Sequence, residues 1–157
     1  DENEHGPYYV MERVNGQSLQ HFIDNQPIPA NRLRDVFLGI LDGLRHIHTH
    51  LMVHRDLKPT NILLDTQHWI PKIIDFGFAK HPSYPDIDVT DIGTGGYMAP
   101  EQRGDQQDVD ARADIYAVGC VFYAMITREH PQTIDVSKIT EPLQAVIARC
   151  AQSNPAD

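Results

Sequence analysis

The sequence has few basic residues, few cysteines and no long apolar run. Its 157 residues include 13 Lys and Arg against 22 Asp and Glu, for a formal net charge of -9. That balance argues against nucleic acid or anionic membrane as the main partner, because both attract basic surfaces. The longest apolar run, residues 117–126, is too short to cross a bilayer. The chain opens without a signal peptide pattern, and Cys120 and Cys150 make no metal-binding spacing, which fits a reducing compartment.

What is present is ordinary globular composition. Apolar residues make up 41% of the chain and charged residues 22%, enough for a packed core. The chain starts at Asp1 rather than Met and reaches an apolar run within eight residues. It stops at Asp157, directly after an Asn-Pro pair. Neither end resembles a natural terminus, so we expect a piece of a longer protein.

Apolar spacing predicts most elements of the first half. Aromatic and β-branched residues over 8–11 predict a strand. Leu19, Phe22 and Ile23 lie at helical spacing after Ser18, which is a good N-cap, and predict a short helix. A longer amphipathic helix is predicted where apolar residues recur every three or four positions, at Leu33, Val36, Phe37, Ile40, Leu41, Leu44, Ile47 and Leu51.

The second half alternates short apolar runs with turn residues. Residues 62–64 and 72–74 predict a small β-ribbon, and the Pro-, Asp- and Gly-rich stretch 81–96 predicts a long loop. Residues 115–126 are apolar nearly all round and predict a buried helix with Asp114 at its start. A last amphipathic helix is predicted around residues 143–150, with Thr140 as N-cap and Pro142 in its first turn.

Three short motifs occur in a fixed order. Residues 54–61 read His-Arg-Asp-Leu-Lys-Pro-Thr-Asn, residues 75–77 read Asp-Phe-Gly, and residues 99–101 read Ala-Pro-Glu. This set resembles the signature of eukaryotic-type Ser/Thr protein kinases, over nearly the whole chain. The resemblance implies a kinase-like α+β fold, here a mainly α-helical C-terminal lobe with a small β-ribbon. The short stretch 127–140, where such kinases place a substrate-docking helix, would suit a bacterial member.

The resemblance implies roles for the polar residues of these motifs. Asp56 is expected to accept the proton of the substrate hydroxyl, Lys58 to lie near the transferred phosphoryl group, and Thr94 to brace both. Asn61 and Asp75 are expected to bind Mg²⁺, which prefers hard oxygen ligands. A lone loop Asp is usually just solvated, but the joint spacing overrides that reading here. Lys58 and the Gly-Thr pair ending at Thr94 resemble Ser/Thr rather than tyrosine kinases.

The front of the chain resembles the ATP pocket of this family. Met11 corresponds to the gatekeeper, and Glu12 and Val14 to hinge residues whose backbone would bind adenine. Ser18 falls at the ribose-contacting position, and Leu63 at the apolar floor beneath the base. Plain core packing is the alternative for Met11 and Leu63. The cofactors implied are ATP and Mg²⁺.

Regulatory and scaffold residues are implied as well. Arg55 precedes the base, as in kinases that are switched on by activation-loop phosphorylation. Thr90 stands at the usual phosphosite, where a phosphate would meet Arg55 and Lys80. An unmodified polar loop residue is the alternative for Thr90. Asp114 is expected to hold the catalytic-loop backbone, and Glu101 to pair with an Arg expected just beyond residue 157.

Four histidines resemble a metal cluster. Because residues two apart on a helix do not share a face, only His46 and His50 could act together. A third ligand is not evident, so we expect no functional metal site there. In the kinase interpretation His48 and His54 are structural.

The sequence therefore predicts residues 1–16 as the last strand of a small lobe plus the hinge, and residues 17–157 as an incomplete large lobe. The parent would transfer the γ-phosphoryl group of ATP to Ser or Thr of a protein substrate. We expect a cytoplasmic location, without a nucleic acid partner or a membrane segment in this sequence; an anchor elsewhere is left open. Because the glycine-rich turn, its lysine and the helix glutamate are absent, this piece alone should be nearly inactive. A pseudokinase scaffold and a small-molecule phosphotransferase of related fold are the alternatives.

Overall fold

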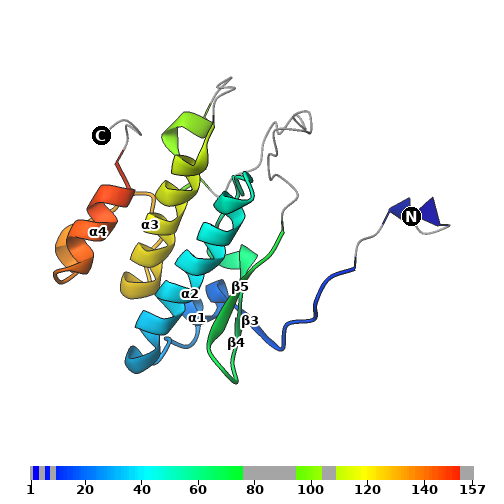
Figure 1. Cartoon of the computed structure of the whole chain (residues 1–157). Helices are drawn as coiled ribbons and strands as arrows, with labels where there is room; N and C mark the ends of the chain where they lie inside the picture. The colour runs from blue at the N-terminus through cyan, green and yellow to red at the C-terminus, as the bar shows by residue number, and fades with distance from the viewer. Residues whose placement is uncertain (1, 4–5, 8–9, 76–94, 104–108, 153–157) are drawn as a thin grey trace.

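A helical body packs against a small antiparallel sheet in the computed structural model of the chain (Figure 1). It describes residues 2–3, 6–7, 10–75, 95–103 and 109–152. The helices are α1 (Leu19–Asp24), α2 (Ala30–Thr49), α3 (Ala111–Thr127) and α4 (Leu143–Cys150), with short 3₁₀ turns η1 (Pro59–Asn61), η2 (Pro100–Gln102) and η3 (Val136–Lys138). The strands are β1 (Glu2–Asn3), β2 (Gly6–Pro7), β3 (Gly16–Ser18), β4 (Ile62–Asp65) and β5 (Ile70–Ile73). The predicted fold class, mainly helical with a small β component, is confirmed.

The core forms between α2 and α3. The apolar stripe of α2 turns inward, and Val36, Phe37, Ile40, Leu44 and Ile47 are buried. Helix α3 is buried nearly all round, as its apolar sequence predicts. The rings of Phe37 and Phe122 stack with centroids 4.3 Å apart. Burying one such side chain contributes about 1.5–3 kcal/mol, so this interface is a main source of stability. Leu41 and Leu51, predicted on the same stripe, are exposed, and the helix ends at Thr49 before Leu51.

The predicted ribbon is present and has a third strand. The strand order is β3-β4-β5, antiparallel throughout. Strand β5 lies close against α2 because two glycines face it. A Cβ on Gly39 would come within 2.7 Å of Pro71, and one on Gly43 within 3.2 Å of Ile73. The residues Gly-Gln-Ser of β3 have no strand-like composition, so only their pairing with β4 makes them a strand.

The prediction of a strand over residues 8–11 is wrong for residues 10 and 11, the two of these that the structure describes. Val10 and Met11 lie in no strand, and residues 10–15 run out from the sheet as an extended, largely exposed segment (Figure 1). A strand exists only where a neighbour satisfies its backbone hydrogen bonds, and no described strand pairs with this segment. Tyr8, Tyr9 and most of the loop predicted over 81–96 lie outside the described residues.

Two helix starts differ from the prediction, and one agrees. Ser18 caps α1 as predicted, with its Oγ accepting from the His21 backbone N–H at 3.3 Å. Helix α3 begins a turn earlier than predicted, because Asp110 caps it and Asp114 lies inside its first turn. At α4 the N-cap is Pro142 rather than Thr140. The Thr140 hydroxyl is not the cap, because this helix start has no side-chain cap hydrogen bond.

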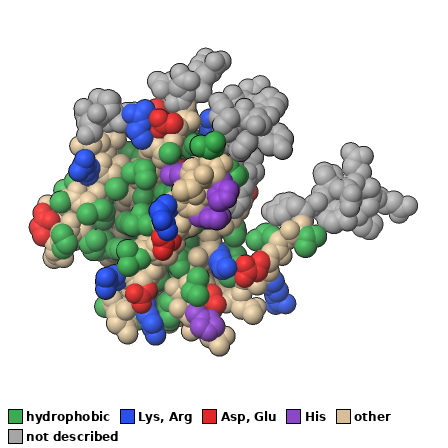
Figure 2. Space-filling model, viewed as in Figure 1, with side chains coloured by type: hydrophobic (Ala, Val, Ile, Leu, Met, Phe, Trp, Pro, Cys, Tyr) green, Lys and Arg blue, Asp and Glu red, His purple; other side chains and the backbone are tan. Residues whose placement is uncertain are grey.

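Acidic and basic side chains are interspersed on the surface shown in Figure 2. On that face no contiguous basic patch forms among the described residues, in keeping with the acidic composition. None of the helices in the described ranges has both the length and the apolar character needed to cross a membrane.

Candidate active site

Residues 54–58 form a loop that one buried carboxylate holds from beneath. Asp114, only 1% exposed, accepts the backbone N–H groups of His54 and Arg55 at 2.9 Å each. Its Oδ2 also accepts from His48 Nε2 at 2.8 Å. The expectation that Asp114 holds this loop backbone is confirmed, and so is the structural role of His48. Because most of α3 is buried in the core, it gives the loop a firm base.

Asp56 sits above this base with two polar partners. Its side chain is 12% exposed, and the Lys58 Nζ lies 2.7 Å from one carboxylate oxygen and 3.0 Å from the other. The Asn61 Nδ2 donates to the Asp56 carboxylate at 3.0 Å and to its backbone oxygen at 2.9 Å. The three residues that the motif singles out therefore converge on one point. A carboxylate held by two donors has a fixed rotation, as a positioned base requires.

His54 ties this point to the end of β5. The ring is fully buried; its Nδ1 accepts the Asp56 backbone N–H at 3.3 Å, while Nε2 donates to the Ile74 carbonyl at 3.0 Å. This pattern assigns the ring proton to Nε2. The imidazole thus links Asp56 to Ile74, the residue before Asp75, and the structural role expected for His54 is confirmed.

Asn61 lies directly before β4, and Asp75 lies two residues after β5, its neighbour in the sheet. Ile62 pairs with Ile73 across β4 and β5, and the Asn61 carbonyl accepts from the Ile74 backbone N–H at 2.9 Å. The Asn61 Nδ2 is engaged by Asp56, and among the described residues the amide oxygen of Asn61 accepts from the Thr60 hydroxyl at 3.4 Å. An amide oxygen and a carboxylate are hard oxygen donors of the kind that Mg²⁺ accepts, so the chemistry of Asn61 and Asp75 fits that cation. Asp75 has a left-handed φ of 64°, a conformation common at functional sites.

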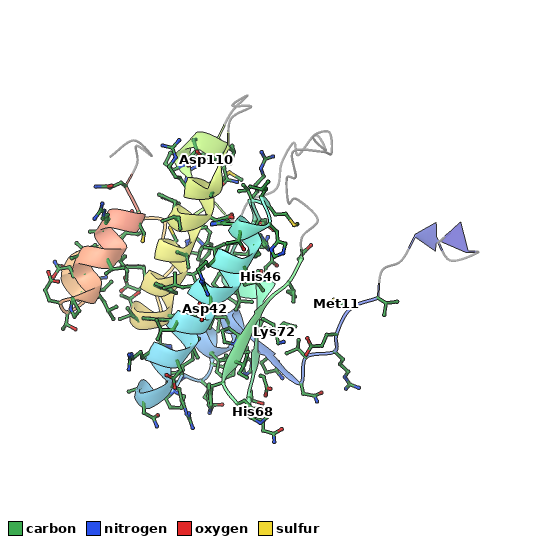
Figure 3. All side chains as sticks on the ribbon, in the orientation of Figure 1. Met11, Asp42, His46, His68, Lys72 and Asp110 are labelled. Carbon is green, nitrogen blue, oxygen red and sulfur yellow. The ribbon has the colours of Figure 1, made fainter. Side chains whose placement is uncertain are left out.

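The predicted nucleotide contacts are brought together only in part. Ser18 and Leu63 are direct partners across β3 and β4, with Leu63 half-buried. Met11 is 49% exposed on the segment that leads away from the sheet, as Figure 3 shows, so core packing does not describe it. On the same segment, Glu12 pairs with the Lys72 Nζ at 3.2 Å, and Val14 is half-buried.

Part of the predicted regulatory apparatus lies outside the described residues, namely Lys80, Thr90 and Thr94. Arg55 is described: it has a left-handed φ of 67°, and its Nη2 donates to the Val109 carbonyl at 3.4 Å. Its guanidinium therefore lies near the start of α3. Because Thr90 lies outside the described residues, its role as a phosphosite stays a prediction.

Sequence reasoning missed Gln102. Its Nε2 donates to the Arg55 carbonyl at 2.7 Å, and its Oε1 accepts from the Ala99 backbone N–H at 3.1 Å. The Ala-Pro-Glu motif ends one residue before it. A side-chain bond to a backbone oxygen 47 positions away has no signature in a single sequence.

The remaining reactive side chains have other roles. The rings of His46 and His50 lie 4.4 Å apart, and the His50 Nδ1 donates to the His46 carbonyl at 2.8 Å. Within the described ranges, no three His, Cys, Asp or Glu side chains come together to hold a metal. Burial raises the pKa of the Cys120 thiol to about 12, so it is protonated and inert as a nucleophile at neutral pH.

The sequence was compared with known proteins and with protein families. The protein kinase domain family matches residues 2–155. A probable serine/threonine-protein kinase PknB of Bifidobacterium longum is 36% identical over 156 residues, covering 90% of this chain and 22% of that protein. A probable serine/threonine-protein kinase of Streptomyces coelicolor is 32% identical over 174 residues, with 95% of this chain and 26% of the relative covered.

The serine/threonine-protein kinase PknB of Mycobacterium tuberculosis is 38% identical over 135 residues, which cover 82% of this chain and 21% of that protein. The chain thus spans 21–26% of the length of these three relatives. The family match, the motif order and the convergence of Asp56, Lys58 and Asn61 agree: the chain belongs to the protein kinase family.

Proposed function

We propose that this chain is the large lobe of an ATP-dependent protein kinase that phosphorylates Ser and Thr hydroxyls, with Asp56 as the catalytic base. The observation that carries the proposal is the Asp56 carboxylate, held by Lys58 and Asn61 on a loop anchored to α3. The named relatives are Ser/Thr kinases, which supports the choice of acceptor.

Each side chain then has a distinct task. Asp56 orients the substrate hydroxyl and receives its proton as the oxygen attacks the γ-phosphorus. Lys58, within 3.0 Å of Asp56, lies close enough to place its ammonium group beside the transferred phosphoryl group and stabilise its charge. Asn61 and Asp75 would hold Mg²⁺, which supplies charge neutralisation to the phosphates. Thr94 is proposed to brace Asp56 and Lys58, as the family resemblance implies.

The nucleotide is proposed to lie over the sheet. Its base would rest on Leu63 and its ribose would meet Ser18, the direct partner of Leu63 across the strands. The Ser18 oxygen accepts from the His21 N–H, which leaves its own proton available for a ribose oxygen. Met11 and the backbone of Glu12 and Val14 would complete the adenine site.

Regulation by phosphorylation of Thr90, read by Arg55 and Lys80, remains part of the proposal. We also propose that the 157-residue chain alone transfers phosphate poorly, because positioning of the phosphates is most of the catalysis. The glycine-rich turn and the lysine that supply it in this family are absent from the sequence.

The complete gene product with Mg²⁺ and γ-labelled ATP provides the test. We expect label on Ser or Thr of a generic protein substrate, and a loss of roughly 100- to 10,000-fold in kcat for Asp56→Asn, which removes the base without changing its shape. Asp42→Asn, an identical change at an exposed site on α2, is the control. Transfer only to small hydroxyl compounds would replace the proposal with a small-molecule phosphotransferase. Nucleotide binding without any transfer would indicate a pseudokinase.

A further inference from the structure

We infer that Gln102 is a positioning residue that holds Asp56 in place from the segment of residues 95–103, which we call the docking segment. The inference rests on the proposed function, because Asp56 is taken as the base. It concerns one peptide unit, the bond between Arg55 and Asp56. Fixing that unit fixes the direction in which the Asp56 side chain leaves the backbone.

Both ends of this peptide unit are held. The Arg55 carbonyl accepts from the Gln102 Nε2 at 2.7 Å, and the Asp56 N–H donates to the His54 Nδ1 at 3.3 Å. The preceding N–H, that of Arg55, is bound by Asp114 at 2.9 Å. Arg55 has a left-handed φ of 67°, which a non-glycine residue keeps only where its surroundings impose it. Removing the Gln102 donor would take one bond from a part-buried carbonyl and loosen this peptide, although the bonds of its neighbouring N–H groups to Asp114 and His54 remain.

The segment that carries Gln102 is itself well anchored. Tyr97 is buried, and its ring meets the His130 ring edge-on at 5.5 Å. Gly96 lies so close to His130 that a Cβ there would come within 2.5 Å of the ring. The Gln102 Oε1 accepts from the Ala99 N–H, which fixes the amide in the orientation that aims Nε2 at Arg55. Gln102 therefore joins two firm bodies, the docking segment and the catalytic loop.

Two substitutions separate its two hydrogen bonds. Gln102→Glu has the same shape and keeps an acceptor for Ala99, but it offers no donor to the Arg55 carbonyl. Gln102→Lys keeps a donor for that carbonyl and loses the acceptor. The same changes at exposed Gln152, which follows α4, control for the added charge. All are made in the complete gene product, and kcat and the KM for ATP are measured by varying ATP up to saturation with the protein substrate held saturating.

We expect Gln102→Glu to lower kcat about 10- to 100-fold, with the KM for ATP changed less than twofold, because a base displaced by a fraction of an ångström is enough for such a loss. Gln102→Lys should retain kcat within about threefold of wild type. A merely structural role predicts a different pattern. Both variants would then lower the unfolding temperature, and Gln102→Glu would not lose more kcat than Gln102→Lys.

Equal kcat values for wild type and Gln102→Glu would overturn the inference, as would a larger loss in Gln102→Lys than in Gln102→Glu. If Gln102→Glu does not fold, Gln102→Met tests the same loss without charge, and an unchanged kcat there has the same consequence. A wild-type protein without transfer activity would instead refute the proposed function, so the two failures are distinguishable.

Discussion

Replacing Asp114 by Asn should loosen the catalytic loop while preserving the shape of the core. The carboxylate accepts three hydrogen bonds, from the backbone N–H groups of His54 and Arg55 and from the ring of His48. An Asn can place its single oxygen toward His48 and His54, and its amide group then faces the Arg55 N–H. Two donors would then point at each other inside the protein, where the Arg55 N–H now meets a carboxylate oxygen.

The size of the effect follows from these contacts. A hydrogen bond to a charged group contributes about 1.5–3 kcal/mol, and an unsatisfied buried donor costs about 1–3 kcal/mol. Losing one such bond and stranding one donor should lower the free energy of unfolding by about 3 kcal/mol. For a domain of this size that is a fall of about 6–12 °C in Tm. It is a large part of a typical stability of about 5–15 kcal/mol, yet it leaves the protein folded.

Thermal unfolding of the complete gene product, followed by circular dichroism, measures the change. Asp110→Asn is the matched control, because Asp110 lies on the same helix but is 55% exposed (Figure 3). Asn caps a helix about as well as Asp, and the exposed ion pair with Arg112 that the control also removes contributes about 0.2–1 kcal/mol, so the control should shift Tm by about 3 °C or less. If Asp114→Asn melts within a degree of Asp110→Asn, the carboxylate does not anchor the loop and the reasoning fails.

Two further predictions concern packing and pH. Gly39→Ala should lower stability by about 1–3 kcal/mol, because its Cβ would meet Pro71 at 2.7 Å, whereas Gly43→Ala should cost less. Equal urea midpoints for the two variants would contradict this close approach of α2 and β5. The pKa of Glu129 is lowered, chiefly by its hydrogen bond from Lys138. Its contribution is therefore present above the ordinary Glu pKa of 4.5 and lost as pH falls through the lower folded value. Glu129→Gln should melt below wild type at pH 6 and match it at pH 2; a constant difference across that range would refute the linkage.

Local pattern predicted the helices well because burial repeats along them. The apolar stripe of α2 and the apolar run in α3 could be read from spacing alone, and most of their apolar residues are buried, with Leu41 and Ile115 as exceptions. The motif residues Asp56, Lys58 and Asn61 converge because they lie within five positions of one another on a single tight loop. The strand over residues 8–11 failed for the opposite reason: pairing depends on a partner that local composition does not specify.

Contacts between distant segments could not be predicted in this way. Arg128 donates to the carbonyls of Ile23 and Asp24 at 2.8 and 2.9 Å, closing the end of α1 from over 100 positions away. Gln102 reaches the Arg55 carbonyl across 47 positions. Both use side chains common on surfaces and backbone acceptors that every residue has, so no residue type marks the partner.

The sequence by itself determined the family, the helical character and the identity of the polar residues in the catalytic loop, because motif order and apolar period are local properties. The family resemblance also implied that Asp114 holds that loop and that His54 is structural, but the tertiary structure alone decided which atoms they bind and added Gln102 as a further contact. Hydrogen bonds need distance and direction, and these exist only once α3, β5 and the docking segment have packed around the loop.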